Sequence, residues 1–124
     1  MSAAENIANT KNAYAAFSAG DIPGALALVA PDAEWVVAGN SVVSGSYKGH
    51  DEIVGFWMKL PEKGFTTTPT AFFGDEDTVV VLTNTTLADE VSEQADVLEF
   101  SDGLLVRFRT IGEVEVFERV FGTK

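Results

Sequence analysis

The chain has no cysteine and a single histidine, which excludes several kinds of chemistry. Without cysteine there can be no disulfide, no thiol nucleophile and no thiolate ligand for a metal. One histidine, His50, cannot supply the paired imidazoles of many zinc sites. It stands before Asp51 at the expected start of a helix, where a histidine most often faces solvent or caps the helix. We therefore expect no metal, and because no cofactor-binding motif is present we expect no cofactor.

Positive charge is also scarce. The chain has 8 lysines and arginines against 19 aspartates and glutamates, so its formal net charge is −11 at pH 7. A negative field of this size repels nucleic acid and anionic lipid, and we expect neither as a partner. No apolar run approaches the length of a membrane-spanning helix, and the N-terminal residues lack the basic and apolar stretches of a secretory signal. A cytoplasmic location is the default expectation.

What the chain does contain is enough apolar sequence for one core. It has 124 residues, of which 46% are apolar, and this predicts a single domain over residues 1–124. The periodicity predicts helices over residues 5–19, 22–30, 51–60 and 113–121, and strands over 33–37, 65–73, 78–87, 95–100 and 104–111. This order is typical of an α+β domain with helices packed on one face of a curved antiparallel sheet. Such a sheet tends to enclose a cavity that binds small ligands.

The last two strands place one carboxylate, Asp96, in an unusual position. If the loop is the three residues 101–103, Asp96 faces Phe108 on the apolar side and both Arg107 and Arg109 lie on the other side. If the loop has two residues, Asp96 faces Arg109 as an ordinary cross-strand ion pair. We prefer the first register because it keeps the apolar face intact. It predicts a carboxyl group that faces the interior of the domain.

Four short segments, in order, resemble those of a known family. They are Tyr14-Ala15-Ala16-Phe17-Ser18-Ala19-Gly20-Asp21, Ala30-Pro31-Asp32-Ala33-Glu34-Trp35, Tyr47-Lys48-Gly49-His50-Asp51-Glu52-Ile53, and Phe100-Ser101-Asp102-Gly103 followed by Val106-Arg107-Phe108-Arg109. The chain resembles, over nearly its whole length, SnoaL-like proteins of the nuclear transport factor 2-like superfamily, which includes ketosteroid isomerase. The resemblance implies a cone-shaped α+β barrel, with the curved sheet wrapped around N-terminal helices and an internal pocket. It also implies a homodimer formed through the sheet.

The resemblance transfers site residues only in part. Asp96 falls where ketosteroid isomerase has its oxyanion-hole aspartic acid, which that enzyme keeps protonated. The position of the isomerase's general base is Val37, and the position of its oxyanion tyrosine is Ala13, with Tyr14 one residue away. The resemblance to SnoaL-like cyclases suggests Glu113 as an acid or base. The chain is therefore not an orthodox ketosteroid isomerase.

The leading hypothesis is a protein that binds a small, mostly apolar molecule. If it is catalytic, the expected chemistry is proton transfer next to a carbonyl, as in an isomerase, cyclase or dehydratase. Asp96 would be the acid or oxyanion donor, and Glu113 or a pocket water would assist. For any one of the apolar pocket candidates, plain core packing is the safer explanation. The resemblance also matches Trp57 to a polar aromatic residue near the isomerase's site. The candidates are Tyr14, Trp35, Val37, Trp57, Leu98, Phe100 and Phe108.

Two other functions stay open. A non-catalytic ligand-binding or dimerisation module predicts that Asp96 is ionised and salt-bridged. An epoxide hydrolase requires two carboxylates and an arginine around one water, so it predicts that Arg107 or Arg109 lies beside Asp96 inside the cavity. Asn84 and Thr86 alternate along their strand, and they either add polar contacts inside the cavity or face water.

Overall fold

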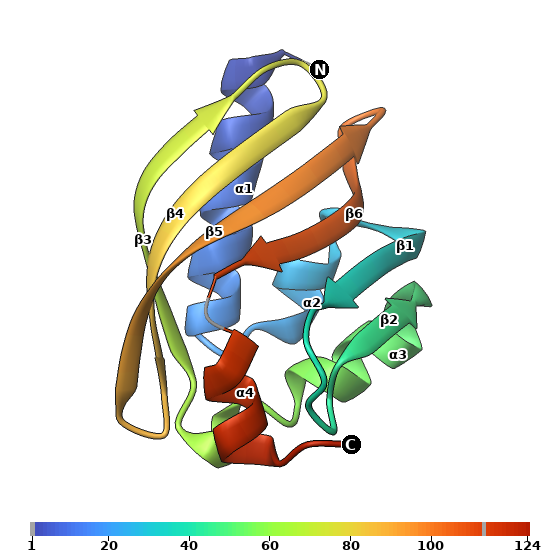
Figure 1. Ribbon diagram of the computed structural model, residues 1–124. Coiled ribbons are helices and arrows are strands. Elements are labelled where there is room, and N and C mark those ends of the chain that lie inside the picture. Colours follow the sequence, from blue (N-terminus) through green and yellow to red (C-terminus); the bar gives the residue numbers. More distant parts are fainter. Residues whose placement is uncertain (1, 113) are drawn as a thin grey trace.

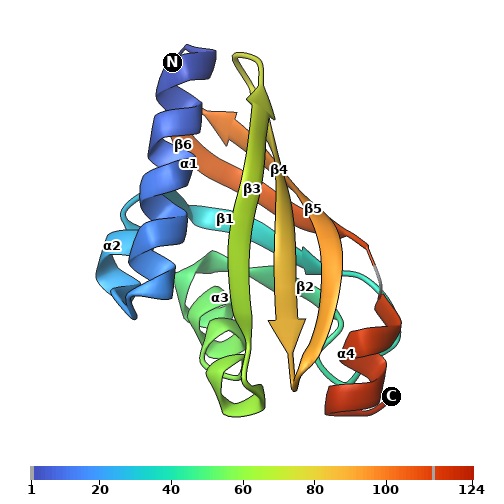
Figure 2. The same cartoon turned by 90° about the vertical axis from the view of Figure 1, so that its left-hand side faces the viewer.

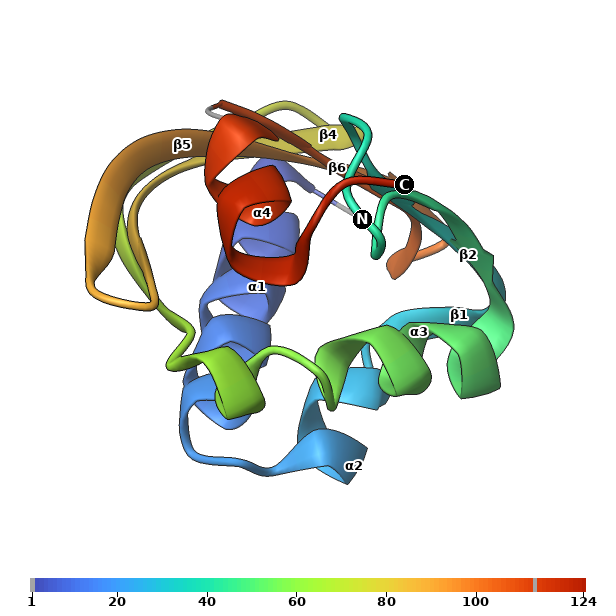
Figure 3. The ribbon, with the colours of Figure 1, turned by 60° about the horizontal axis from the view of Figure 1, so that its bottom comes forward.

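The computed structural model describes residues 2–112 and 114–124, and in them one six-stranded sheet curves around helices (Figure 1). Seen from the end of the sheet, the helices lie on its inner side (Figure 3). No helix in these residues is long and apolar enough to cross a membrane. The elements are α1 (Ala3–Ser18), α2 (Ile22–Leu26), β1 (Val29–Val37), β2 (Gly45–Lys48), α3 (Gly49–Trp57), a short 3₁₀ helix (Pro61–Lys63), β3 (Thr66–Gly74), β4 (Thr78–Leu87), β5 (Glu90–Ser101), β6 (Leu104–Ile111) and α4 (Val114–Phe121).

The predicted α+β class is confirmed, but two features of the predicted sheet are wrong. The strand order is β2-β1-β6-β5-β4-β3, and β1 runs parallel to β6, so the sheet is mixed. In the described residues β2 and β3 form the two edges and are not paired with each other, so hydrogen bonds do not close a barrel. The sequence pattern missed the parallel pair because β1 and β6 lie far apart in the chain.

The N-terminal helices follow from local chemistry. The Ser2 hydroxyl accepts a hydrogen bond from the Glu5 amide at 3.1 Å, and the Glu5 carboxylate accepts one from the Ser2 amide at 3.5 Å. These two bonds form a capping box at the start of α1. Figure 2 shows α1 lying along β3. The second helix is shorter than predicted, because Val29 pairs with Leu105 as the first residue of β1 instead of continuing the helical stripe.

The hairpin between β5 and β6 differs from the preferred register. Asp102 and Gly103 both have positive φ, 51° and 79°, which forms a tight two-residue turn and pairs Ser101 with Leu104. An irregularity at Glu99 and Phe100 then shifts the pairing by one residue, so that Asp96 lies opposite Thr110. Asp96 points inward, as predicted, on the same face of β5 as Leu98 and Phe100, although its partner is neither Phe108 nor Arg109.

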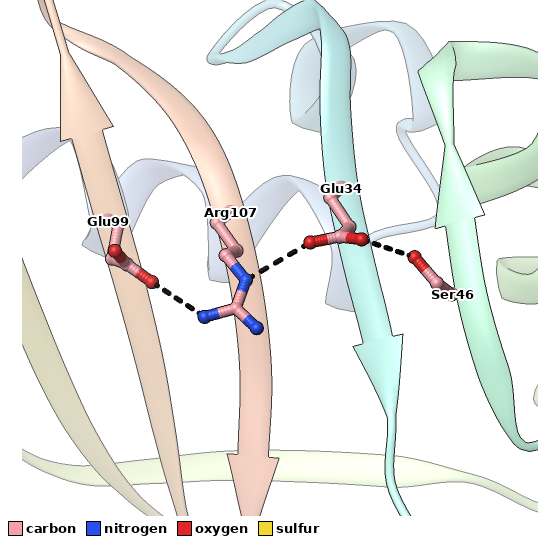
Figure 4. A network of polar contacts seen from close by, with 4 residues as sticks. All are labelled: Glu34, Ser46, Glu99 and Arg107. Carbon is pink, nitrogen blue, oxygen red and sulfur yellow. Dashed lines mark hydrogen bonds and ion pairs between the residues drawn. The ribbon is translucent and has the colours of Figure 1, made fainter.

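The outer face of the sheet carries a row of charged side chains that crosses three strands (Figure 4). Arg107 on β6 donates to Glu34 on β1 at 3.1 Å and to Glu99 on β5 at 3.3 Å, and the Ser46 hydroxyl on β2 donates to Glu34 at 2.6 Å. The hydrogen bonds from Ser46 and Arg107 lower the pKa of the Glu34 carboxyl. This arrangement holds Arg107 away from the interior.

Candidate functional site

A cavity of about 140 Å³ lies between the inner face of the sheet and the helices. A closed apolar cavity of about 150 Å³ is large enough to hold benzene, so this space accepts at least a single ring. Its wall is mostly apolar and combines residues of all four α-helices and of five strands of the sheet, β1 and β3 to β6. The apolar residues other than those predicted are Ala13, Phe17, Ala25, Val29, Val36, Ala38, Phe56, Leu60, Phe65, Leu105, Val114 and Phe117.

The structure brings most of the predicted site residues together at this cavity. Phe100 is buried at 7% exposure but is not part of the cavity wall. Glu113 lies outside the described residues. Val37, which the resemblance matches to the isomerase's general base, lines the cavity with an apolar side chain. The predicted residues that line the cavity are Tyr14, Trp35, Val37, Trp57, Asp96, Leu98 and Phe108.

Aromatic rings form one wall of the cavity. The rings of Trp35 and Phe108 are stacked, with centroids 3.6 Å apart and an angle of 12° between their planes. Trp57 meets Trp35 edge to face at 5.3 Å and meets Phe17 in the same way at 5.5 Å. The chain's two tryptophans therefore both line the cavity, and their fluorescence should report a bound ligand.

The Asp96 carboxyl group lies on the cavity wall with two hydroxyl partners. The Tyr14 hydroxyl, from α1, donates a hydrogen bond to Oδ2. The Thr110 hydroxyl, from β6, donates to Oδ1 at 2.9 Å. Tyr14 was predicted as a pocket residue only, one position away from the isomerase's tyrosine, and the structure makes it the direct partner of Asp96. Thr110 was missed, because only the correct hairpin register places it opposite Asp96.

Burial sets the ionisation of this group. Asp96 is 6% exposed, and this desolvation raises the pKa of its carboxyl to about 6, against the opposing effect of the hydrogen bonds from Tyr14 and Thr110. The pKa of the Tyr14 hydroxyl is also raised, first by burial and then by the negative charge of Asp96. Tyr14 therefore stays a neutral donor while Asp96 changes charge near neutral pH.

No cation compensates the charge of Asp96 in the described residues. Arg107 is bound on the outer face, and Arg109 is exposed opposite Val97 on the same face. The ion pair that the binding-module hypothesis predicts for Asp96 is thus absent from this part of the chain. Neither arginine lines the cavity, so the contact that would favour an epoxide hydrolase is missing as well.

Further polar residues continue the wall beyond Asp96. Gln94 is two residues earlier on β5, and Thr85 and Thr67 follow on β4 and β3. Asn84, which was considered as an inward contact, is exposed on the outer face instead. The sequence signal for Gln94 was available, since residues two apart on a strand point to the same face. Among the described residues, no group of three His, Cys, Asp or Glu side chains is arranged to hold a metal ion.

The first prediction concerns the titration of Asp96. We expect carboxyl-carbon NMR, assigned with Asp96→Asn, to give a pKa near 6. Tyr14→Phe removes a hydrogen bond that stabilises the ionised form, so the pKa in that variant should be higher than in the wild type. A wild-type pKa at or below the reference of about 3.9 would contradict the desolvated site.

Comparison with known proteins identifies the fold. Bal32a, from a soil-derived mobile gene cassette, is 22% identical with a TM-score of 0.89, over 96% of this chain and 98% of that one. An NTF2-like protein of unknown function from Burkholderia pseudomallei is 25% identical with a TM-score of 0.83, over 94% and 97%. TerC, co-crystallised with polyporic acid, is 26% identical with a TM-score of 0.82, over 96% and 99%. No curated protein sequence matches the chain.

These likenesses define an NTF2-like α+β fold. The model of the SnoaL-like domain matches residues 10–108, and the chain belongs to this family.

Proposed function

We propose that this protein binds a small, largely apolar ketone in the cavity and transfers a proton at the carbon next to the carbonyl, with Asp96 as the general base. The observation that carries this proposal is the Asp96 carboxyl group, buried on an apolar cavity wall with no cation beside it among the described residues. A catalytic base works best when its pKa lies near the operating pH. A pKa of about 6 leaves Asp96 mostly ionised at pH 7 and still able to hold a proton.

The hydrogen bonds around Asp96 favour the base over the acid role considered from sequence. Both carboxyl oxygens already accept a hydroxyl hydrogen, which stabilises the ionised acceptor form. The remaining lone pairs are available to take a proton from a ligand carbon. The products of this step are a protonated Asp96 and an enolate, and the reverse step returns the proton to carbon.

Tyr14 can stabilise the enolate that this proton transfer produces. Once Asp96 is protonated, its O–H can donate to the Tyr14 oxygen, and the Tyr14 hydrogen is then released from the carboxylate. The hydroxyl can turn toward the enolate oxygen and donate to it. A positioned donor of this kind stabilises developing negative charge in a site of low polarity.

The test uses β-tetralone, a bicyclic ketone whose protons next to the carbonyl exchange with solvent. We expect the wild-type protein to bind it, seen as a change in tryptophan fluorescence. We also expect the protein to accelerate deuterium incorporation from D2O, followed by proton NMR, by about 10²- to 10⁴-fold over buffer. The pH profile should rise toward a plateau above pH 6, because only the ionised carboxyl accepts a proton.

Binding without exchange would favour the second candidate, a non-catalytic ligand-binding module. One observation supports that candidate: Val37 lines the cavity where the related isomerase has its base, and Asp96 is the only acid on the wall among the described residues. A profile that falls above pH 6 would return Asp96 to the acid role. The absence of binding would overturn the proposal.

TerC, which was co-crystallised with polyporic acid, supports a ligand-binding role for this kind of fold.

We also propose that the protein forms a homodimer through the outer face of its sheet. Apolar side chains gather there across four strands, next to the row of charged residues, and Phe73 and Ile111 are more than half exposed, at 58% and 54%. Exposed apolar patches often mark interfaces, and a two-fold dimer needs only one such patch. The patch consists of Phe73, Val80, Leu82, Ala95 and Ile111, next to the buried Val97 on the same face of β5.

The dimer prediction can be tested by light scattering coupled to gel filtration. The wild-type protein should show twice the chain mass of 13.2 kDa. Leu82→Glu places a charge in the centre of the patch and should give the monomer mass, because a buried unpaired charge is costly. Asn84→Glu, on the same face of β4 but outside the patch, should stay dimeric. A monomeric wild-type protein would contradict the proposal.

A further inference from the structure

Gln94 gives the cavity a second polar position. It precedes Asp96 by two residues on β5, so both side chains point to the inner face, and both line the cavity. Two strand residues span about 7 Å. A ligand with one oxygen at Asp96 would therefore present its far end, about one fused ring system away, to Gln94.

One polar atom of Gln94 is unused. Its Nε2 donates to the Ser92 hydroxyl at 3.0 Å, and its Oε1 makes no hydrogen bond to any described residue. Gln94 is 8% exposed. Among the described residues, two side-chain atoms are fully buried and have no hydrogen-bond partner, namely Asn6 Oδ1 and Trp57 Nε1, and Gln94 Oε1 is not one of them. Gln94 Oε1 thus keeps some accessible surface, and Gln94 is one of the residues that line the cavity.

The chain leaves space for this amide at Gly112, directly after the end of β6. A Cβ atom at Gly112 would lie 2.8 Å from Gln94 Cγ and 3.2 Å from its Cβ. Any side chain at Gly112 would therefore displace Gln94. The backbone of Gly112 does not have the positive φ that restricts a position to glycine, so close packing against Gln94 is the reason for a small residue there.

Threonine hydroxyls extend the polar surface near Gln94, because Thr85 lies opposite Ser92, whose hydroxyl accepts the hydrogen bond from Gln94. Thr85 and Thr67 line the cavity, with their hydroxyl oxygens 3.4 Å apart, and Thr85 is 3.0 Å from the Thr83 hydroxyl. Thr85 is 3% exposed, so its hydroxyl is held in a fixed place on the wall. A ligand hydroxyl at this point could donate to Gln94 Oε1 and also contact a threonine oxygen.

We propose that Gln94, with Thr85 farther along the same wall, forms a second polar subsite that recognises a hydroxyl group at the end of the ligand remote from the ketone. The ligand class is then a hydroxylated cyclic ketone instead of a purely apolar one. This inference rests on the proposed function, because it takes the ketone end to lie at Asp96. Gln94 is a specificity-determining residue in this proposal and takes no part in the proton transfer.

The experiment compares three ligands: β-tetralone, its analogue with a hydroxyl on the far edge of the aromatic ring, and its analogue with a methyl group at that same place. Dissociation constants come from tryptophan fluorescence. Wild-type protein should bind the hydroxyl analogue about three- to tenfold more tightly than the methyl analogue, the contribution of one neutral hydrogen bond. Gln94→Leu should remove or reverse this preference, measured as the ratio of the two dissociation constants.

Two further variants make the test specific. Gly112→Ala leaves the amide in the chain but takes its space, and it should weaken the hydroxyl preference. Asn84→Leu removes an amide from the outer face of the sheet and should leave the preference unchanged. Equal binding of the hydroxyl and methyl analogues by the wild-type protein would overturn the subsite and leave the proposed function intact. Failure of all three ligands to bind would overturn both.

Discussion

Replacing Asp96 with asparagine should slow the exchange of β-tetralone protons by about 10²- to 10⁴-fold, to near the rate in buffer. Asparagine has nearly the same shape and still accepts a hydrogen bond, so the cavity and its apolar wall remain. What it lacks is an oxygen that can take up a proton. Proton NMR in D2O measures the rate, and an exchange rate that equals the wild-type rate would rule out Asp96 as the base.

Asp96→Asn should also be more stable than the wild type at neutral pH. This measurement shows whether slower exchange could come from unfolding of the variant. The folded-state pKa of Asp96 is raised to about 6 from an ordinary 3.8, so between these values the folded protein holds a proton that the unfolded chain has lost. Stability therefore falls as pH rises through this window, by about 3 kcal/mol in total. Asp96→Asn removes this loss. Urea unfolding should show it more stable at pH 7 and closer to the wild type at pH 4.

Phe108→Ala should reduce the free energy of unfolding by about 3–5 kcal/mol, the usual cost of removing a buried aromatic ring. Phe108 is 7% exposed, pairs directly with Trp35 in the parallel register of β1 and β6, and stacks on its ring. Removing the Phe108 ring leaves a void between β1 and β6, the two strands that carry the stacked rings on the cavity wall. Urea unfolding followed by circular dichroism gives the size of the effect.

Met58→Ala is the matched control for that measurement. Met58 is 57% exposed at the end of α3, and a change at such a position usually alters stability by less than about 0.5 kcal/mol. Similar losses in the two variants would contradict the role of the stacked pair. A small loss in Phe108→Ala would mean that neighbouring rings fill the space.

Local patterns in the sequence predicted most elements of the fold but not every neighbour. β4 was predicted with its observed bounds, and α1, α3 and β3 within a few residues, because each has a strong apolar period and a clear stop signal. The parallel pairing of β1 with β6 was not predictable in this way. Nothing in a strand's own residues records the direction of a partner more than sixty positions away, so the expected antiparallel sheet was wrong.

Of the candidate site, the sequence predicted the buried carboxyl group but not the hydroxyl groups that bind it. Asp96 was found because an acid within an apolar strand is unusual, and that signal is local. Its partners Tyr14 and Thr110 come from α1 and β6, and their contact with Asp96 depends on helix packing and on the shifted hairpin register. The preferred register placed Phe108 opposite Asp96, two residues away from the observed partner Thr110, and so Thr110 was missed.

The open sheet has a consequence for how the protein avoids aggregation. An unclosed sheet presents two edges whose free amides and carbonyls can pair with strands of other molecules. Here β2 is only four residues long, and β3 is interrupted at Pro69, where the register with β4 also shifts. Proline offers no amide hydrogen to a new strand, and the break prevents a long straight ladder. Both edges are thus poor templates for fibril growth.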